Sequence, residues 1–216
     1  AKLHQRTPGD AGPGSYLDWA ERSWQWFEGS GMMNEDHLIN DGLNAACENN
    51  GDVTWTYNQG VVLGGLIELY RIKGDREYLQ TAQSIADAAI RTLVNEDGIL
   101  REPCEQNGCG ADGPSFKGIF MRYLNMLYDE TKEIRYRKFV ERNVDALWAN
   151  RTSTNLIGVK WDRPADVIGA APQHSALDAV NGLVQKEPKG SNALPNVARH
   201  KNAVGSAACS PAETPE

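Results

Sequence analysis

The sequence is poor in the features that mark nucleic-acid-binding, membrane-spanning and cofactor-dependent proteins. Its 22 Lys and Arg residues are outnumbered by 29 Asp and Glu, and the net charge of −7 argues against nucleic acid as a partner, because affinity for phosphates comes mainly from basic side chains. No apolar run approaches the roughly 20 residues that a membrane-spanning helix needs. The four histidines lack metal-ligand spacing, and no Gly-rich phosphate loop is present. We therefore expect neither a metal nor a cofactor.

Cysteine is also scarce, with four residues in the whole chain. Cys104 and Cys109 lie close together in the Gly-rich segment EPCEQNGCGAD, a spacing that favours a local disulfide. A zinc site would normally show two close pairs of cysteines or histidine partners. The alternative is a set of reduced thiols, as in a protein of a reducing compartment.

Helical periodicity is the strongest signal in the sequence, and strand signals are nearly absent. Residues 61–70 are apolar on nearly every side apart from Glu68, which predicts a helix buried between others. Residues 78–93 place apolar side chains at helical spacing with polar ones between them, which predicts an amphipathic surface helix. The same pair of patterns recurs at 116–128 and 135–148.

A third copy of this pair is incomplete at the start of the chain. Residues 16–27 resemble the amphipathic helix, and residues 3–10 resemble only the end of a buried one. The Gly-Asp turn at Gly9 recurs at Gly74, 65 residues later. Tandem helical hairpins predict a solenoid or a closed ring, in which each repeat buries its faces against its neighbours.

These patterns divide the chain into two parts. We expect residues 1–186 to form an all-α unit of about three to four helical hairpins, ending in a last helix at 174–184. Residues 187–216 are polar and lack helical period, so we expect a poorly ordered tail.

Polar residues gather in the two loops that lead into the buried helices, 38–60 and 98–118. These loops combine carboxylates, amides and aromatic rings, a mixture suited to sugars, because flat rings stack on the apolar face of a sugar and the polar groups pair with its hydroxyls. Helices that begin at the same end of a ring would bring both loops to one cavity. The residues expected to bind substrate are Asp41, Trp55, Tyr57, Asn58, Gln59, Glu102 and Lys117.

Most of these candidates have a structural alternative, and Asn58 could simply cap the helix N-terminus. Trp55 and Tyr57 could be core residues, and Asp41 could simply belong to a turn. Glu102 and Lys117 could be solvated charges with no binding role. The sequence alone leaves these alternatives open.

Several blocks of the sequence resemble one enzyme family. They are LINDGL, WTYNQGVVLGGLIELY, GILREPCE with the Cys104 and Cys109 pair, FKGIFMRYL and NVDALWANR, between about Leu3 and Val184. Together they resemble glycoside hydrolase family 76, the endo-α-1,6-mannanases. The resemblance implies an incomplete (α/α)6 toroid, of which this chain would be a C-terminal portion. It also implies mannan or manno-oligosaccharides as the substrate and secretion or attachment to a cell wall.

The sequence departs from the family pattern in one respect. The resemblance implies a catalytic pair of adjacent aspartates N-terminal to all these blocks, and this chain contains no Asp-Asp dipeptide. A retaining glycosidase needs two carboxyl groups about 5–5.5 Å apart, so we predict that this chain lacks its catalytic pair. Two other classes stay open, namely a non-catalytic glycan-binding module and a helical-repeat scaffold for protein partners.

Overall fold

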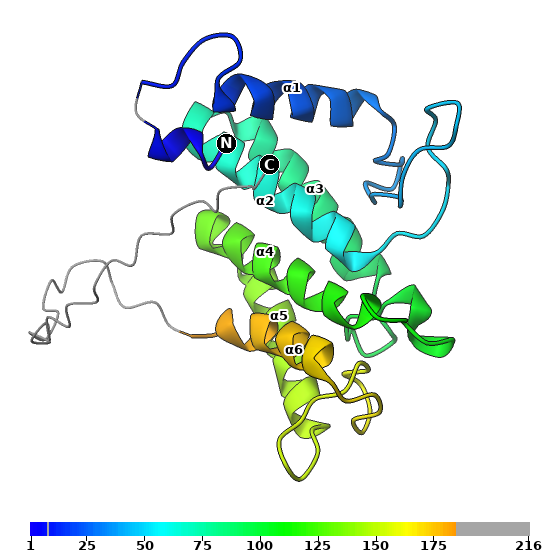
Figure 1. Ribbon diagram of the computed structural model, residues 1–216. Coiled ribbons are helices and arrows are strands. Elements are labelled where there is room, and N and C mark those ends of the chain that lie inside the picture. The colour runs from blue at the N-terminus through cyan, green and yellow to red at the C-terminus, as the bar shows by residue number, and fades with distance from the viewer. Residues whose placement is uncertain (8, 185–216) are drawn as a thin grey trace, which may run out of the picture. The chain divides into compact units, whose positions relative to one another are not determined.

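The computed structural model describes residues 1–7 and 9–184, and the tail expected at 187–216 lies outside them. Over this part of the chain the structure is all-helical, with isolated bridges and no strand, which confirms the predicted fold class. Among the described residues, no helix combines the length and apolar character needed to cross a membrane. The helices, shown in Figure 1, are α1 (Tyr16–Gly29), α2 (Thr56–Lys73), α3 (Arg76–Thr92), α4 (Phe116–Thr131), α5 (Ile134–Ala149) and α6 (Ala170–Asn181), with short 3₁₀ helices η1 (His4–Arg6), η2 (Pro103–Gln106) and η3 (Gly113–Ser115).

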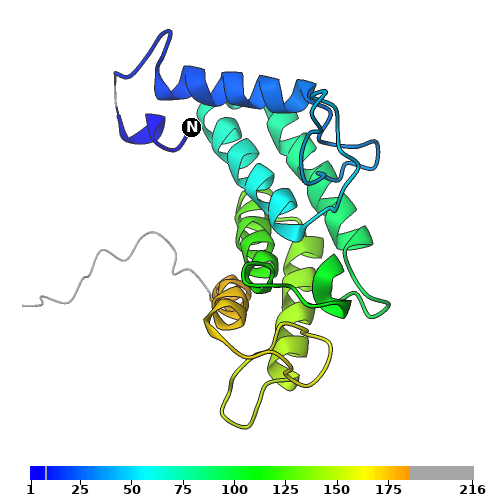
Figure 2. The same ribbon diagram turned by 45° about the vertical axis from the view of Figure 1, so that its right-hand side comes forward.

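The helices form two layers. α2, α4 and α6, which we term the inner helices, lie next to one another, α2 against α4 and α4 against α6. Of the outer helices, α3 packs on α2 and α4, and α5 packs on α4 and α6 (Figure 2). α1 also belongs to the outer layer, and its Trp24 and Phe27 pack against the core next to α2.

The inner helices run in the same direction and approach closely at glycines. A Cβ atom at Gly60 of α2 would lie 2.7 Å from the Cα of Phe120 in α4, and one at Gly118 would lie 2.5 Å from the Cα of Ser175 in α6. Larger residues at these positions would force the helices apart. Because the three helices are parallel, their N-terminal ends and the preceding loops meet at one end of the layer.

The predicted Gly-Asp turn joins α2 to α3. Gly74 ends α2 with a φ of 71°, a left-handed conformation that glycine adopts readily, and the Asp75 side chain caps α3 by accepting from the N–H of Glu77 at 3.0 Å. In the other copy, Asp10 accepts from the N–H of Tyr16 at 2.8 Å, and Ser15 is the N-cap of α1. In both copies the aspartate of the turn thus accepts from a backbone N–H in the first turn of the next outer helix, although only Asp75 is itself the N-cap.

Four loops between helices share one hydrogen-bonding pattern. A side-chain oxygen at the first position accepts from the backbone N–H four residues later, and the fourth residue has a positive φ. Such local bonds fix a loop without sheet partners. The first positions are Asn34, Asn44, Asn95 and Thr152, and the positive-φ positions are His37, Cys47, Gly98 and Asn155.

Two details differ from the sequence prediction. α6 begins at Ala170 rather than at 174, because Pro172 fits in the first turn of a helix, where no N–H is needed. α2 is not buried on all sides, since Val61 is 51% exposed.

Candidate functional site

An aromatic cluster joins the N-terminal ends of α2 and α4. The rings of Trp55 and Tyr57 pack on Phe116, with centroids 5.6 and 4.3 Å apart respectively. All three side chains are half-buried, so each keeps an accessible part. Phe116 was not among the predicted site residues, although its place at the end of the second polar loop was a signal that could have found it.

Polar groups lie next to this cluster. Burial raises the pKa of the Tyr57 phenol, and the negative charges of Asp41 and Glu102 raise it further. Asp41 is exposed, and the side-chain Nδ2 of Asn58 is buried without a hydrogen-bond partner in the described part of the chain. The charge of Asp41 thus acts on the Tyr57 phenol, next to Asn58.

Gln59 lies deeper and holds the first loop in place. Its Oε1 accepts from the N–H of Ile39 at 2.8 Å, and its Nε2 donates to the carbonyls of Ile39 and Trp55, both at 2.9 Å. The side chain is fully buried. Since both ends of the amide already have protein partners, Gln59 fixes the loop that carries Asp41 and Trp55.

Glu102 is 2% exposed and ties the second loop to the start of α2. It accepts from the N–H of Thr56 at 3.3 Å and from the Thr56 hydroxyl. Burial raises the pKa of Glu102 to about 7, against the opposing effects of the Thr56 hydrogen bonds and the Lys117 charge. Thr56 is a contact that sequence reasoning missed.

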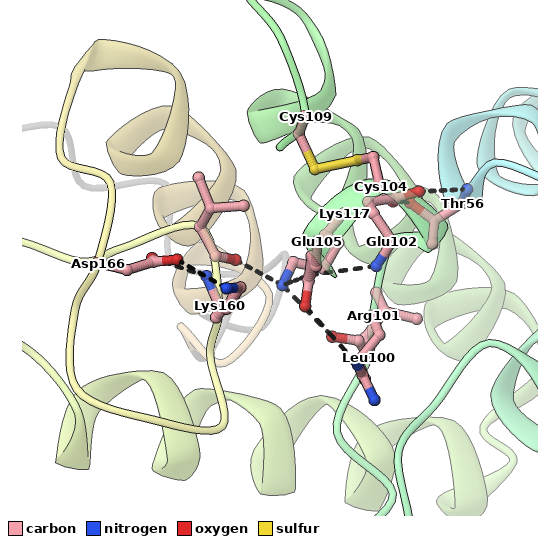
Figure 3. The surroundings of a disulfide bond; sticks show 11 residues. Thr56, Leu100, Arg101, Glu102, Cys104, Glu105, Cys109, Lys117, Lys160 and Asp166 are labelled. Atoms are coloured by element: carbon pink, nitrogen blue, oxygen red, sulfur yellow. Dashed lines mark hydrogen bonds and ion pairs between the residues drawn. A yellow bond between two sulfur atoms is a disulfide. The ribbon is translucent and has the colours of Figure 1, made fainter. Parts of the chain in front are cut away.

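Lys117 is likewise 2% exposed, and its ammonium group connects three segments of the chain. Figure 3 shows its Nζ beside Glu105, with which it forms an ion pair at 2.6 Å. The same Nζ donates to the carbonyl of Val159 at 2.7 Å and to that of Leu100 at 3.4 Å. It also lies 4.4 Å from the centre of the Trp161 ring, a cation–π contact. Burial lowers the pKa of Lys117, while the charge and hydrogen bond of Glu105 oppose that shift.

The predicted disulfide between Cys104 and Cys109 is present and clips the loop that carries Glu105. Gly113 packs directly against it, since a Cβ atom there would lie 2.7 Å from the Cβ of Cys109. Cys47 is an exposed free thiol.

Replacing Cys104 and Cys109 together with Ser is expected to lower the free energy of unfolding by about 2 kcal/mol, because the open chain regains the conformational freedom of a short loop. Urea unfolding followed by circular dichroism measures this. Cys47→Ser is the matched control and should leave stability unchanged within about 0.5 kcal/mol. Equal stability of the double variant and the wild type would contradict a structural role for the disulfide.

The predicted residues therefore fall into two groups. The first group lies at the aromatic cluster and has accessible or unpartnered side chains, namely Trp55 and Tyr57 within the cluster and Asp41 and Asn58 beside it. The second group is buried with protein partners, namely Gln59, Glu102 and Lys117. In the described residues no group of three or more His, Cys, Asp or Glu side chains is placed to hold a metal ion. The arrangement suits recognition of a hydroxyl-rich ligand by stacking and hydrogen bonding.

Comparison with known proteins identifies the family. The model of glycosyl hydrolase family 76 matches residues 2–193. The chain belongs to this family. It is 31% identical over 192 residues to mannan endo-1,6-alpha-mannosidase DFG5 of Candida albicans, an alignment that covers 80% of this chain and 42% of that protein.

Solved structures agree with the fold. The Lin0763 protein from Listeria innocua is 32% identical with a TM-score of 0.68, covering 77% of this chain and 48% of that one. The GH76A alpha-1,6-mannanase from Salegentibacter sp. HEL1_6 is 25% identical with a TM-score of 0.67, covering 77% and 51%. The chain thus matches part of an (α/α)6 toroid. It spans less than half the length of the first curated relatives and about half the length of these two solved structures.

Proposed function

We propose that this chain contributes the glycan-binding loops of an α-1,6-mannan-directed glycoside hydrolase. Membership of family 76 supports the glycosidase class. The substrate is inferred from relatives, which are mannan endo-1,6-alpha-mannosidases, and from the Salegentibacter enzyme, whose inactive variants bind α-1,6-mannotriose and α-1,6-mannotetrose.

The aromatic cluster is the observation that carries this proposal. Trp55 and Tyr57, held on Phe116, offer ring faces on which pyranose rings stack. Asp41 and the unpartnered amide of Asn58 supply groups for sugar hydroxyls. The buried candidates Gln59, Glu102 and Lys117 then serve the site indirectly, by holding the two loops.

The same proposal includes the absence of a catalytic pair from this chain. The inactive Salegentibacter variants carry replacements at two consecutive aspartates, and this chain has no consecutive aspartates. Glu102 and Glu105 are close in sequence, but both are buried and bonded to protein groups.

The proposal also includes secretion of the protein or its attachment to a cell wall. The disulfide supports this localisation, because disulfides persist mainly in oxidising compartments such as the cell exterior.

Replacing both Trp55 and Tyr57 with Ala is expected to weaken binding of α-1,6-mannotetraose by about tenfold to thirtyfold, since each stacked ring contributes roughly 1 kcal/mol. Isothermal titration calorimetry measures the affinity. Trp148→Ala, at an exposed tryptophan of α5, is the matched control and should bind as the wild type does.

Two outcomes would contradict the proposal. Unchanged affinity of the double variant would remove the aromatic cluster from the site. Release of shorter products from α-1,6-mannohexaose, followed by mass spectrometry, would show that the chain holds a carboxylate pair of its own. We expect bound but intact substrate.

A further inference from the structure

The sequence contains one glycosylation sequon, Asn150-Arg151-Thr152, which the proposed function does not use. Such a sequon normally marks the attachment point of a glycan, a bulky group that belongs on the surface. The sugar carbon bonds to Nδ2 of the asparagine and replaces one of the two hydrogens that this nitrogen carries. Whether Asn150 can hold a glycan therefore depends on what its amide nitrogen already contacts.

The Asn150 amide is fully engaged in the folded chain. Asn150 is the C-cap of α5 and is half-buried. Its Nδ2 donates to the carbonyl of Ala146 at 3.0 Å and to the carbonyl of Trp161 at 3.1 Å. Both partners are acceptors, so the nitrogen of the amide, and not its oxygen, faces them. Both hydrogens of Nδ2 are thus in use, and a carbonyl oxygen lies in each direction in which a sugar could be attached.

The rest of the sequon is held as well. The N–H of Asn150 donates to the carbonyl of Ala146 at 3.1 Å, and the carbonyl of Asn150 accepts from the N–H of Ala165 at 2.9 Å. The hydroxyl of Thr152 accepts from the N–H of Leu156, also at 2.9 Å. The sequon therefore forms the junction between α5 and the loop that follows it.

The bond from Asn150 to Trp161 connects this junction to the buried lysine. Trp161 is 1% exposed, and the centre of its ring lies 4.4 Å from Nζ of Lys117. The same Nζ donates to the carbonyl of Val159 at 2.7 Å. Segment 159–161 is thus held by Asn150 at the end of α5 and by Lys117 in the first turn of α4. Since Ala146 belongs to the same helix as Asn150, a sugar on Nδ2 would displace the Trp161 carbonyl and loosen this segment.

We propose that Asn150 is a structural residue that fixes segment 159–161 and not a glycan acceptor, so that the folded protein carries it unmodified. A chain glycosylated there before folding would lose one of the two Nδ2 hydrogen bonds and would have to place a bulky, hydrated sugar at a half-buried position. Occupancy of the sequon and the native fold therefore exclude each other. This inference does not depend on mannan binding.

Secretion from a yeast host tests the modification. The chain is expressed behind a secretion leader, and its peptides are mapped by mass spectrometry. We expect the folded, secreted chains to carry unmodified Asn150, and any chain with a glycan there to be retained in the cells or to aggregate. Asp52→Asn is the matched control, because it creates a sequon with Thr54 at an exposed loop position and should be secreted with one glycan. Folded, secreted chains with a glycan on Asn150 would overturn the proposal.

Thermal unfolding tests the structural role of the amide. Asn150→Asp keeps the size of the side chain but replaces the donor nitrogen with an oxygen that faces two carbonyls. We expect its melting temperature to fall by about 5 °C or more, because both carbonyls lose their donor. Asn155→Asp is the matched control, since Asn155 is exposed and an aspartate can still accept from Arg151 as its Oδ1 does. This control should melt within about 2 °C of the wild type. An Asn150→Asp variant that melts with the wild type would overturn the structural role.

Discussion

Replacing Lys117 with Met is expected to lower the free energy of unfolding by about 3–5 kcal/mol, the largest effect that we predict for a single side chain. The substitution leaves the carboxylate of Glu105 buried without its close cation, at a site where Lys117 is only 2% exposed. It also removes the donor that the carbonyls of Val159 and Leu100 share. Urea unfolding measures the loss.

A matched control comes from an exposed ion pair. Arg122→Met breaks the contact with Asp178 on the surface, where Arg122 is 45% exposed, and should cost no more than about 1 kcal/mol. The double variant Lys117→Met/Glu105→Gln should lose less than the sum of the two single changes, because no buried charge is left without a partner. A loss for Lys117→Met as small as that of the surface control would contradict the structural role of the buried pair.

Stability is expected to fall as the pH rises from about 4.5 to about 7, through the titration of Glu102. Its pKa is about 7 in the folded protein against an ordinary value of 4.5, so the folded state holds the proton more tightly than the unfolded state does. The contribution is fully present below pH 4.5 and is lost as the pH passes through 7, a change of up to about 3 kcal/mol. Thr56, Lys117, Glu105 and Tyr57 are the groups that interact with this carboxyl.

The measurement compares urea unfolding of the wild type and Glu102→Gln at several pH values. Gln keeps the shape and can still accept from the Thr56 hydroxyl, but it does not titrate. We expect the difference in stability between the two proteins to change between pH 4.5 and 7. A constant difference would show that Glu102 keeps an ordinary pKa.

The helices were largely determined by the sequence because their signals are local. Apolar spacing located α2 to α5, and the Gly74–Asp75 turn follows from a glycine that tolerates positive φ and a carboxylate that caps the next helix. The disulfide is local too, since its cysteines are five positions apart. The family resemblance also rests on contiguous blocks of sequence, and the family model confirms it.

The roles of individual site residues were decided by tertiary structure. Lys117 and Asn58 both lie in the first turn of a helix. The Lys117 ammonium group is buried and donates to the carbonyl of Val159, 42 residues away, whereas Asn58 Nδ2 has no hydrogen-bond partner among the described residues. A sequence shows that a charged residue is present but not which distant carbonyl will meet it. The burial and the hydrogen-bond partners of each candidate side chain depend on how α4 packs between its neighbours. Only the folded chain therefore separates the buried residues that hold the loops, Gln59, Glu102 and Lys117, from the accessible Trp55 and Tyr57.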